Sequence, residues 1–258
     1  MKIKYFDTHS HYNIRPLNDS LEKHFQTLND ENIFVNVVGT NIEDSKIAID
    51  IAKKYNNAIA SIGIHPSEVK SINDLKTLEE LYLNNKEYIK AIGECGLDYH
   101  YENINKEKQK FFFIEQIKLA IKHNLTLVLH IRDAHQDAIK ILNDFEFAKI
   151  KVIIHCYTDK LEFAKEYVKK GFFISIPGVV TFKNAFIVQE VTKWAPLNLL
   201  LTETDAPFLA PVPNRGKTND STNLHFINEF IANLKEVNPE QLNKQLIENA
   251  FFAFNLKL

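Results

Sequence analysis

The stretch Phe6-Asp7-Thr8-His9-Ser10-His11 ends a short run of β-type residues near the N-terminus. Alternate side chains on a strand point to the same side, so His9 and His11 would project together. Neutral imidazole is a common ligand for zinc, iron, nickel and copper. We interpret the pair as two ligands of one metal ion at the end of the first strand. Taken alone, these residues also permit two polar histidines at a strand edge.

Apolar runs of strand type recur along the chain, and helical patterns separate them. The expected strands are 2–7, 33–38, 58–63, 89–93, 125–129, 152–154, 172–176 and 199–202. The expected helices are 20–29, 43–55, 74–84, 106–123, 134–144, 161–170, 183–193, 224–237 and 239–255. Near-continuous apolar strands between helices predict a parallel sheet covered by helices. About eight such units favour an α/β fold with a closed (β/α)8 TIM barrel, formed by residues 1–258 as a single domain.

The composition, with 45% hydrophobic and 25% charged residues, is that of an ordinary globular protein. A formal net charge of −2 argues against a protein that coats polyanions nonspecifically. Two cysteines give no disulfide framework, which favours a reducing compartment. No apolar stretch approaches the roughly 20 residues of a membrane span, so we expect a cytoplasmic protein without a membrane partner. A monomer is the expected state.

Residues that bind metals follow several of the expected strands, and in this fold the active site lies at the carboxyl ends of the strands. The candidate ligands are His9, His11, Glu94, His130, His155 and Asp205. They exceed the four ligands of a tetrahedral zinc and suit two divalent ions that share Glu94. One ion would take His9, His11, Glu94 and Asp205, and the other Glu94, His130 and His155. Nitrogen and oxygen ligands permit Mg, Mn, Zn or Co.

Glu94 and Asp205 are the candidate catalytic residues, since Glu94 can bridge two metals and Asp205 can hold or deprotonate a water. Glu203, on the same strand face as Asp205, is expected to support the ligands. The candidate substrate contacts are His65, Arg132, Arg215 and Lys217. The alternatives are a loop histidine at 65, an acid partner for Arg132, and solvated cations at 215 and 217. The remaining histidines, His24, His100, His123, His135 and His225, are expected at the surface.

Together these residues resemble the TatD-type metal-dependent deoxyribonucleases of the amidohydrolase superfamily. The resemblance rests on stretches 5–11, 63–66, 91–99, 127–134, 154–156, 203–211 and 215–217. It implies a (β/α)8 barrel, the same six metal ligands, and hydrolysis of phosphodiesters in DNA, usually from the 3′ end. Thr158 and Asp159 stand where the family tends to have Ser-Gly, and an acid there would repel a phosphate.

Two other functions remain open. The first is an ester or amide hydrolase on the same site, such as a D-aminoacyl-tRNA deacylase, because metals polarise a carbonyl as well. Arg132, Arg215 and Lys217 favour a phosphate-containing substrate instead. The second is a metal-binding barrel that has lost activity and serves as a binding protein. DNA ends of a few nucleotides are the expected substrate, with RNA or tRNA as alternatives, since no motif that reads a 2′-hydroxyl is identifiable.

Overall fold

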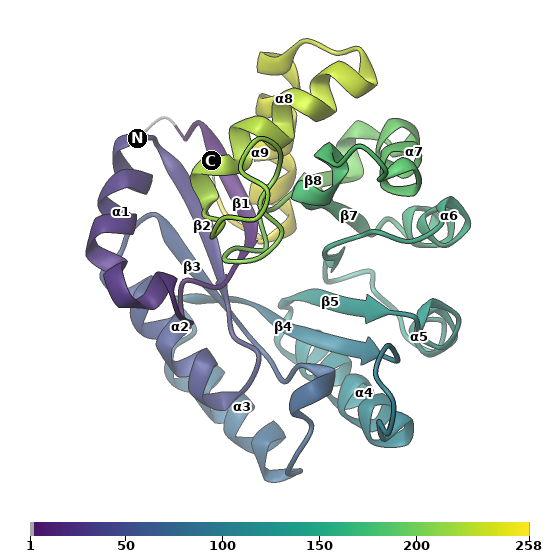
Figure 1. Ribbon diagram of the computed structural model, residues 1–258. Coiled ribbons are helices and arrows are strands. Elements are labelled where there is room, and N and C mark those ends of the chain that lie inside the picture. The colour runs from purple at the N-terminus through teal and green to yellow at the C-terminus, as the bar shows by residue number, and fades with distance from the viewer. Residues whose placement is uncertain (1–2, 258) are drawn as a thin grey trace.

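The computed structural model describes residues 3–257, which form one eight-stranded parallel sheet with the strands in chain order (Figure 1). The strands are β1 (Tyr5–Ser10), β2 (Ile33–Val38), β3 (Ala58–Ile62), β4 (Ile89–Asp98), β5 (Thr126–Arg132), β6 (Val152–Ile154), β7 (Phe173–Ile176) and β8 (Leu200–Thr202). Helices alternate with the strands and surround them. The predicted TIM barrel is therefore confirmed.

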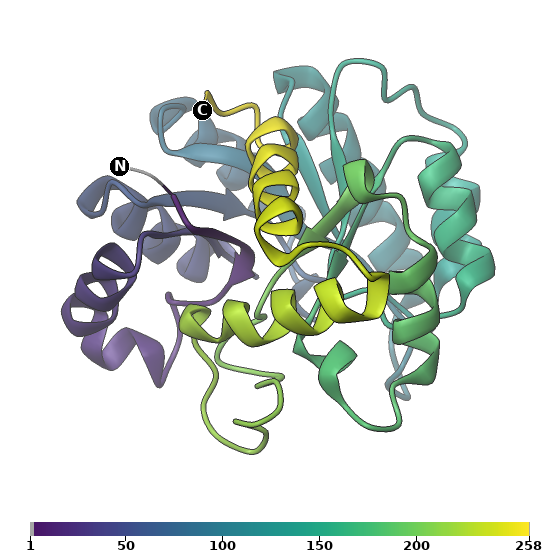
Figure 2. The ribbon, with the colours of Figure 1, turned by 90° about the horizontal axis from the view of Figure 1, so that it is seen from above.

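The helices are α1 (Leu21–Asp30), α2 (Ile42–Lys54), α3 (Asn73–Asn84), α4 (Lys106–His123), α5 (His135–Leu142), α6 (Leu161–Lys169), α7 (Phe186–Trp194), α8 (Leu224–Lys235) and α9 (Pro239–Ala253). The loop 206–222 between β8 and α8 stands out from the barrel in Figure 2. Within residues 3–257, no helix combines the length and the apolar character that crossing a membrane requires.

Two apolar layers explain why the strands are apolar along their whole length. Leu127 and Leu129 of β5 pack outward in the large core beneath the helices. Val128 between them points inward, into a second cluster that receives side chains from most strands, from Phe251 of α9 and from Phe254 just after it. Successive side chains alternate across a strand, so both faces of each strand are buried. His130 lies two residues after Val128, so its side chain also points inward, at the carboxyl end of the barrel.

Irregular strand pairing changes which residues point inward near the carboxyl ends. The pairing of β1 with β2 shifts between Asp7 and Ser10, and that of β4 with β5 shifts between Ile92 and Cys95. Bulges of this kind re-aim the side chains that follow them. Ala91 lies in the inner cluster, and the shift turns Glu94 to the same side.

The structure corrects several expected element ends. Strands β4 and β5 extend to Asp98 and Arg132, so Glu94 and His130 lie within strands rather than just after them. Helix α7 begins at Phe186 instead of 183, because 182–185 form turns after β7. Residue 2, predicted to begin the first strand, lies outside the described residues.

The seam between β1 and β8 closes the barrel with few backbone contacts. Ser10 pairs with Ala206 in one parallel bridge, and the His11 N–H donates to the Ala206 carbonyl at 2.7 Å. Asp7 joins the two sides: its carboxylate accepts hydrogen bonds from the Thr204 N–H at 2.9 Å and from the hydroxyls of Thr204 and Ser221. Burial raises the pKa of Asp7 to about 7 despite these hydrogen bonds.

Gly96 brings β4 and β5 together at the site, which gives a first prediction. Its φ of +144° is one that side-chain-bearing residues rarely adopt, and a Cβ there would overlap the carbonyl oxygen of His130. Backbone strain and overpacking each cost about 1–3 kcal/mol, so Gly96→Ala should destabilise by about 3 kcal/mol. We expect the melting temperature of the metal-free protein, followed by circular dichroism, to fall by about 6–12 °C.

Gly171→Ala is the matched control for Gly96→Ala. Gly171 also has a positive φ, +77°, but a Cβ there would meet nothing within 4 Å. Gly171→Ala should therefore introduce backbone strain alone and lower the free energy of unfolding by about 1 kcal/mol. Equal melting temperatures for the two variants would contradict the close approach at Gly96.

Candidate metal centre

Glu94 lies at the centre of the carboxyl end of the barrel and is buried. Its Oε1 is 2.9 Å from His130 Nδ1 and 2.9 Å from His155 Nε2. Its Oε2 is 3.4 Å from His9 Nε2 and 3.7 Å from His11 Nε2. The two oxygens of one carboxylate therefore face two different pairs of histidines.

Asp205 completes the half of the site that contains His9 and His11. Its Oδ1 is 3.4 Å from His11 Nε2 and 3.8 Å from His9 Nε2. Asp205 follows β8 with a positive φ of +55°, an uncommon conformation that aspartate tolerates better than most residues. The structure thus brings all six predicted ligands together. His9, His11 and Asp205 form one candidate group and Glu94, His130 and His155 form another, while His9 also groups with His155 and Glu203, and His65 with Asp98 and His130.

Most of these histidines have a partner for the ring nitrogen that points away from Glu94. His11 Nδ1 is 2.9 Å from the Val38 carbonyl oxygen, and His130 Nε2 is 3.1 Å from Asp98 Oδ2. His155 Nδ1 is 3.2 Å from Glu203 Oε1. An N–H donated to such an acceptor leaves the lone pair of the other nitrogen directed at Glu94, which is how metal-binding histidines are commonly held.

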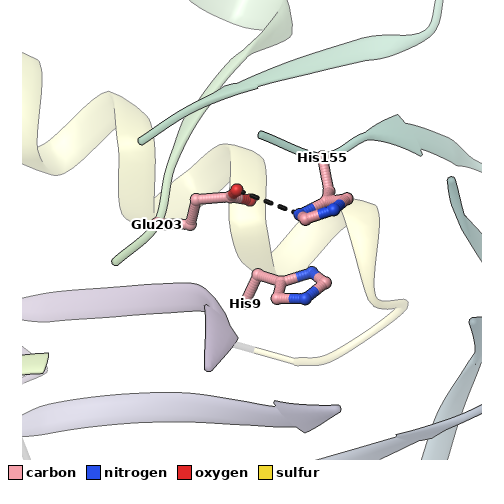
Figure 3. A group of neighbouring side chains, drawn as sticks. All are labelled: His9, His155 and Glu203. Atoms are coloured by element: carbon pink, nitrogen blue, oxygen red, sulfur yellow. Dashed lines mark hydrogen bonds and ion pairs between the residues drawn. The ribbon is translucent and has the colours of Figure 1, made fainter. Parts of the chain in front are cut away.

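His9 differs from the other three histidines. Its ring stacks on that of His155, with centroids 3.9 Å apart, beside Glu203 (Figure 3). His9 Nδ1 and Glu203 Oε2 are buried without a hydrogen-bond partner among the described residues. The Glu203 Oε1 atom accepts from the Cys156 N–H at 2.7 Å, so Glu203 fixes the start of the loop after β6 as well as the His155 ring. Glu203 has the supporting position that its place on the strand predicted.

The ionised form of Glu94 and the neutral form of His9 suit a bound cation. Burial by itself would raise the pKa of Glu94, but the charge of His155 and hydrogen bonds from His130 and His155 hold that pKa well below its usual value. Burial also lowers the pKa of His9, which favours the neutral, metal-binding form. Imidazole nitrogens with carboxylate oxygens are a donor set for divalent transition metals. The residues present therefore fit bound metal.

Asp98 was not among the predicted site residues. It is four residues after Glu94 on β4, hence on the same side of the strand, and that spacing was the available signal. Burial raises the pKa of Asp98, but hydrogen bonds from the His130 ring and the His100 N–H, together with the charges of His130 and Arg132, outweigh burial and keep the pKa below its usual value. An ionised Asp98 holds His130 Nδ1 toward Glu94.

This contact predicts that Asp98→Asn weakens metal binding without abolishing it. The amide keeps the shape of the side chain and removes the charge that orients His130. Loss of such a supporting partner typically costs 10–100-fold in metal affinity, and we expect about that factor. Calorimetric titration with Mn²⁺ or Zn²⁺ measures it, and Asp50→Asn on the exposed side of α2 is the control. Unchanged affinity in Asp98→Asn would contradict this role.

The predicted substrate contacts lie at different distances from the centre. His65 is close: its Nε2 is 3.7 Å from Glu94 Oε1, and its ring lies 4.4 Å from that of His130. Burial lowers the pKa of His65 to about 4, so it is neutral near pH 7. The exposed Arg132 at the end of β5 lies over the Tyr101 ring at 5.7 Å.

Arg215 and Lys217 lie in the exposed part of the 206–222 loop. The Arg215 guanidinium packs on the Phe182 ring at 4.4 Å, and Lys217 donates to Asn214 at 3.2 Å. Within residues 3–257, neither forms an ion pair, and neither contacts the six candidate ligands. The structure therefore does not bring these two cations into the centre.

One of the histidines predicted at the surface is buried. His135 begins α5 with 5% of its area exposed, and its Nδ1 is 2.9 Å from the Tyr167 hydroxyl. The prediction was wrong because α6 packs Tyr167 and Phe163 over the start of α5, a contact between helices that the local sequence does not reveal.

The chain is similar to known proteins of one family along most of its length. Residues 6–255 match the family model described as TatD related DNase. An uncharacterized metal-dependent hydrolase from Mycoplasma genitalium is 39% identical, over 96% of this chain and 98% of the relative. Another from Bacillus subtilis is 38% identical, over 97% of this chain and 99% of the relative.

Solved structures show the same fold. The TatD homologue YjjV from Escherichia coli superposes with a TM-score of 0.94 and 25% identity, with 100% of both chains covered. A TatD-family hydrolase from Entamoeba histolytica has a TM-score of 0.88 at 20% identity, over 98% of each chain. The family model spans nearly the whole barrel and includes all six candidate ligands. This chain belongs to the family of TatD-related DNases.

Proposed function

We propose that this TatD-related metal-dependent hydrolase cleaves phosphodiesters of DNA and removes nucleotides from the 3′ end, with a water that two bound divalent ions would activate. The observation that carries the proposal is the position of Glu94, whose two oxygens face separate histidine pairs. A carboxylate placed in this way is suited to bridge two metal ions. Paired divalent ions, when bound, lower the pKa of a water and neutralise charge on both oxygens of a displacement at phosphorus.

Asp205 is suited to hold the attacking water and accept its proton. Burial would raise the pKa of Asp205, but the hydrogen bond and charge of His11 outweigh burial and keep it below its usual value. The carboxylate is therefore ionised at neutral pH, and 13% of its side chain remains exposed to a substrate. Its Oδ1 faces His9 and His11, so the other oxygen, Oδ2, is the atom that would take the proton.

His65 is suited to donate a hydrogen bond to a phosphate oxygen. Its Nδ1 accepts from the Ser67 N–H at 3.1 Å, so the neutral ring carries its proton on Nε2, the atom that faces Glu94. A neutral donor can orient a phosphate without competing with the metals for negative charge. Arg132, at the end of β5, adds a planar cation that can bind phosphate through two N–H groups.

The test uses one single-stranded DNA oligonucleotide labelled at either end, incubated with Mg²⁺, Mn²⁺ or EDTA. We expect metal-dependent shortening from the 3′ end. A phosphorothioate block at the 3′ end should stop the reaction, and the same block at the 5′ end is the matched control. An oligonucleotide that stays intact with every metal, beside cleavage of a carboxylic ester or of an aminoacyl-tRNA, would replace the proposal by the ester-hydrolase alternative.

A further inference from the structure

A cavity of about 550 Å³ lies beside the metal centre and is not part of it. The segments that follow three of the site strands form its wall: Tyr99 after β4, Asp133 and His135 after β5, and Asp159 and Phe163 after β6. Asp159 is only four residues beyond His155, so at most about 14 Å of extended chain separates the cavity from that histidine. A substrate held in the metal centre can therefore reach it.

His135 and Asp159 present a donor and an acceptor next to each other. His135 is buried, its Nδ1 is paired with the Tyr167 hydroxyl, and its Nε2 is 3.5 Å from Asp159 Oδ2. That separation exceeds the roughly 3.2 Å limit of a good hydrogen bond. Asp159 Oδ1 accepts from the Lys160 N–H at 2.6 Å, which leaves Oδ2 for a ligand.

The other carboxylates of the wall already have partners. Asp137 accepts from the Tyr99 hydroxyl at 2.9 Å and pairs with Lys110 at 2.9 Å. Asp133 pairs with His100 at 2.9 Å. Asp159 is thus the carboxylate of this cavity that is best placed to accept from a ligand.

The remaining lining favours a flat, uncharged ligand. The Phe163 ring packs parallel to His135, with centroids 5.0 Å apart and 14° between their planes, and the Tyr99 ring also lines the space. The aspartates at 133, 137 and 159 outnumber the lysines at 106 and 160, so the cavity does not attract a phosphate. An aromatic ring with hydrogen-bonding groups on one edge is flat and uncharged, and it can pair with both Asp159 and His135.

We propose that this cavity binds one nucleobase of the nucleic-acid substrate, through Asp159 Oδ2 and His135 Nε2. The inference rests on the proposed function and adds a base-binding subsite to it. Each nucleobase has an N–H next to a ring nitrogen or a carbonyl oxygen on its Watson–Crick edge. Asp159 accepts the N–H, and His135, when Tyr167 donates to its Nδ1, donates its own Nε2 proton to the neighbouring acceptor. Because that edge is occupied in a duplex, the subsite selects single strands.

The experiment compares two matched single-stranded oligonucleotides, one complete and one with a single abasic residue at its 3′ end or one position before it. A hydrogen bond to a charged group contributes about 1.5–3 kcal/mol, so kcat/KM should be about 10–100-fold higher with the base. In Asp159→Ala this ratio should fall to about 3 or less, and in Asp50→Ala, an exposed acid on α2, it should stay as in the wild type. If the ratio of kcat/KM between the complete and the abasic strand stayed at the wild-type value in Asp159→Ala, the assignment of Asp159 to the base-binding subsite would be overturned.

Bis(p-nitrophenyl) phosphate is a phosphodiester without a nucleobase. It therefore tests the proposed phosphodiester hydrolysis separately from the base-binding subsite. Metal-dependent hydrolysis of this ester, together with equal cleavage of the complete and abasic strands, would overturn the subsite and leave phosphodiester hydrolysis standing. Failure to cleave the ester and both strands would overturn the proposed function and the subsite together. Hydrolysis of the ester with the expected ratio for the strands supports both.

Discussion

Glu94→Ala should lower kcat/KM for oligonucleotide hydrolysis at least about a thousandfold. The substitution removes an acceptor within 2.9 Å of both His130 and His155, and with it the group that faces the other histidine pair. Paired metals contribute several kcal/mol of transition-state stabilisation, and about 4 kcal/mol corresponds to three orders of magnitude. Initial rates with Mn²⁺ and a 3′-labelled strand give the measurement, and elemental analysis of the purified variant should show a loss of bound metal.

Glu94→Gln separates the charge of this residue from its volume. The amide fills the same space and keeps one carbonyl oxygen, but its NH₂ group cannot bind a metal and would face one of the histidine pairs. We expect a loss close to that of Glu94→Ala, with a wild-type far-ultraviolet circular dichroism spectrum for both. A Glu94→Ala enzyme that retained more than a tenth of wild-type kcat/KM would show that the reaction does not depend on this carboxylate.

Asp7→Ala should have the largest effect on stability, although Asp7 is not among the predicted ligands. The change leaves the Thr204 N–H and the hydroxyls of Thr204 and Ser221 without their buried acceptor at the seam of β1 and β8. Each unsatisfied group costs about 1–3 kcal/mol, so we expect a loss of about 3–5 kcal/mol in the free energy of unfolding. The melting temperature should fall by about 10 °C, measured without metal.

Asp7→Asn should recover much of this loss. Burial raises the pKa of Asp7 to about 7, so a neutral side chain is favourable at this place. The amide oxygen can accept from Thr204, and the NH₂ group can donate to the Ser221 hydroxyl. Asp50→Ala, which removes an exposed carboxylate 3.7 Å from Lys53, is the control and should change stability by less than about 1 kcal/mol. An Asp7→Ala protein that melted within about 2 °C of the wild type would contradict the role of the seam.

The barrel could be predicted because its strands bury both faces. Leu127, Val128 and Leu129 are apolar without alternation, since one face meets helices and the other meets the inner cluster. Such runs mark parallel strands between helices even in a single sequence. The order of the strands follows from chain order once the sheet closes on itself.

The meeting of the six ligands at one end of the barrel could be predicted, but the reason that Glu94 points inward could not. Simple alternation from Ala91 would have turned Glu94 outward, and the pairing shift between Ile92 and Cys95 reverses it. A bulge depends on the neighbouring strand, here through Gly93 against Val128. The local sequence does not reveal that contact.

The supporting contacts were partly predictable. Asp98 lies an even number of residues after Glu94, so both side chains are expected on one face of the strand. The same rule identified Glu203 from Asp205, and it could have identified Asp98. His135 and its cavity could not be anticipated. They depend on Tyr167 and Phe163 of α6 packing over the start of α5, and pairs of residues about 30 positions apart leave no periodic signal.

The most direct test of the account is a crystal structure of the protein grown with Mn²⁺, with data collected at a wavelength where manganese scatters anomalously. A pair of ions bridged by Glu94 predicts two anomalous peaks. One lies among His9, His11 and Asp205, the other lies between His130 and His155, and Glu94 contacts both. A single peak, or two peaks that share no oxygen of Glu94, would contradict the bridged pair of ions on which the proposed reaction depends.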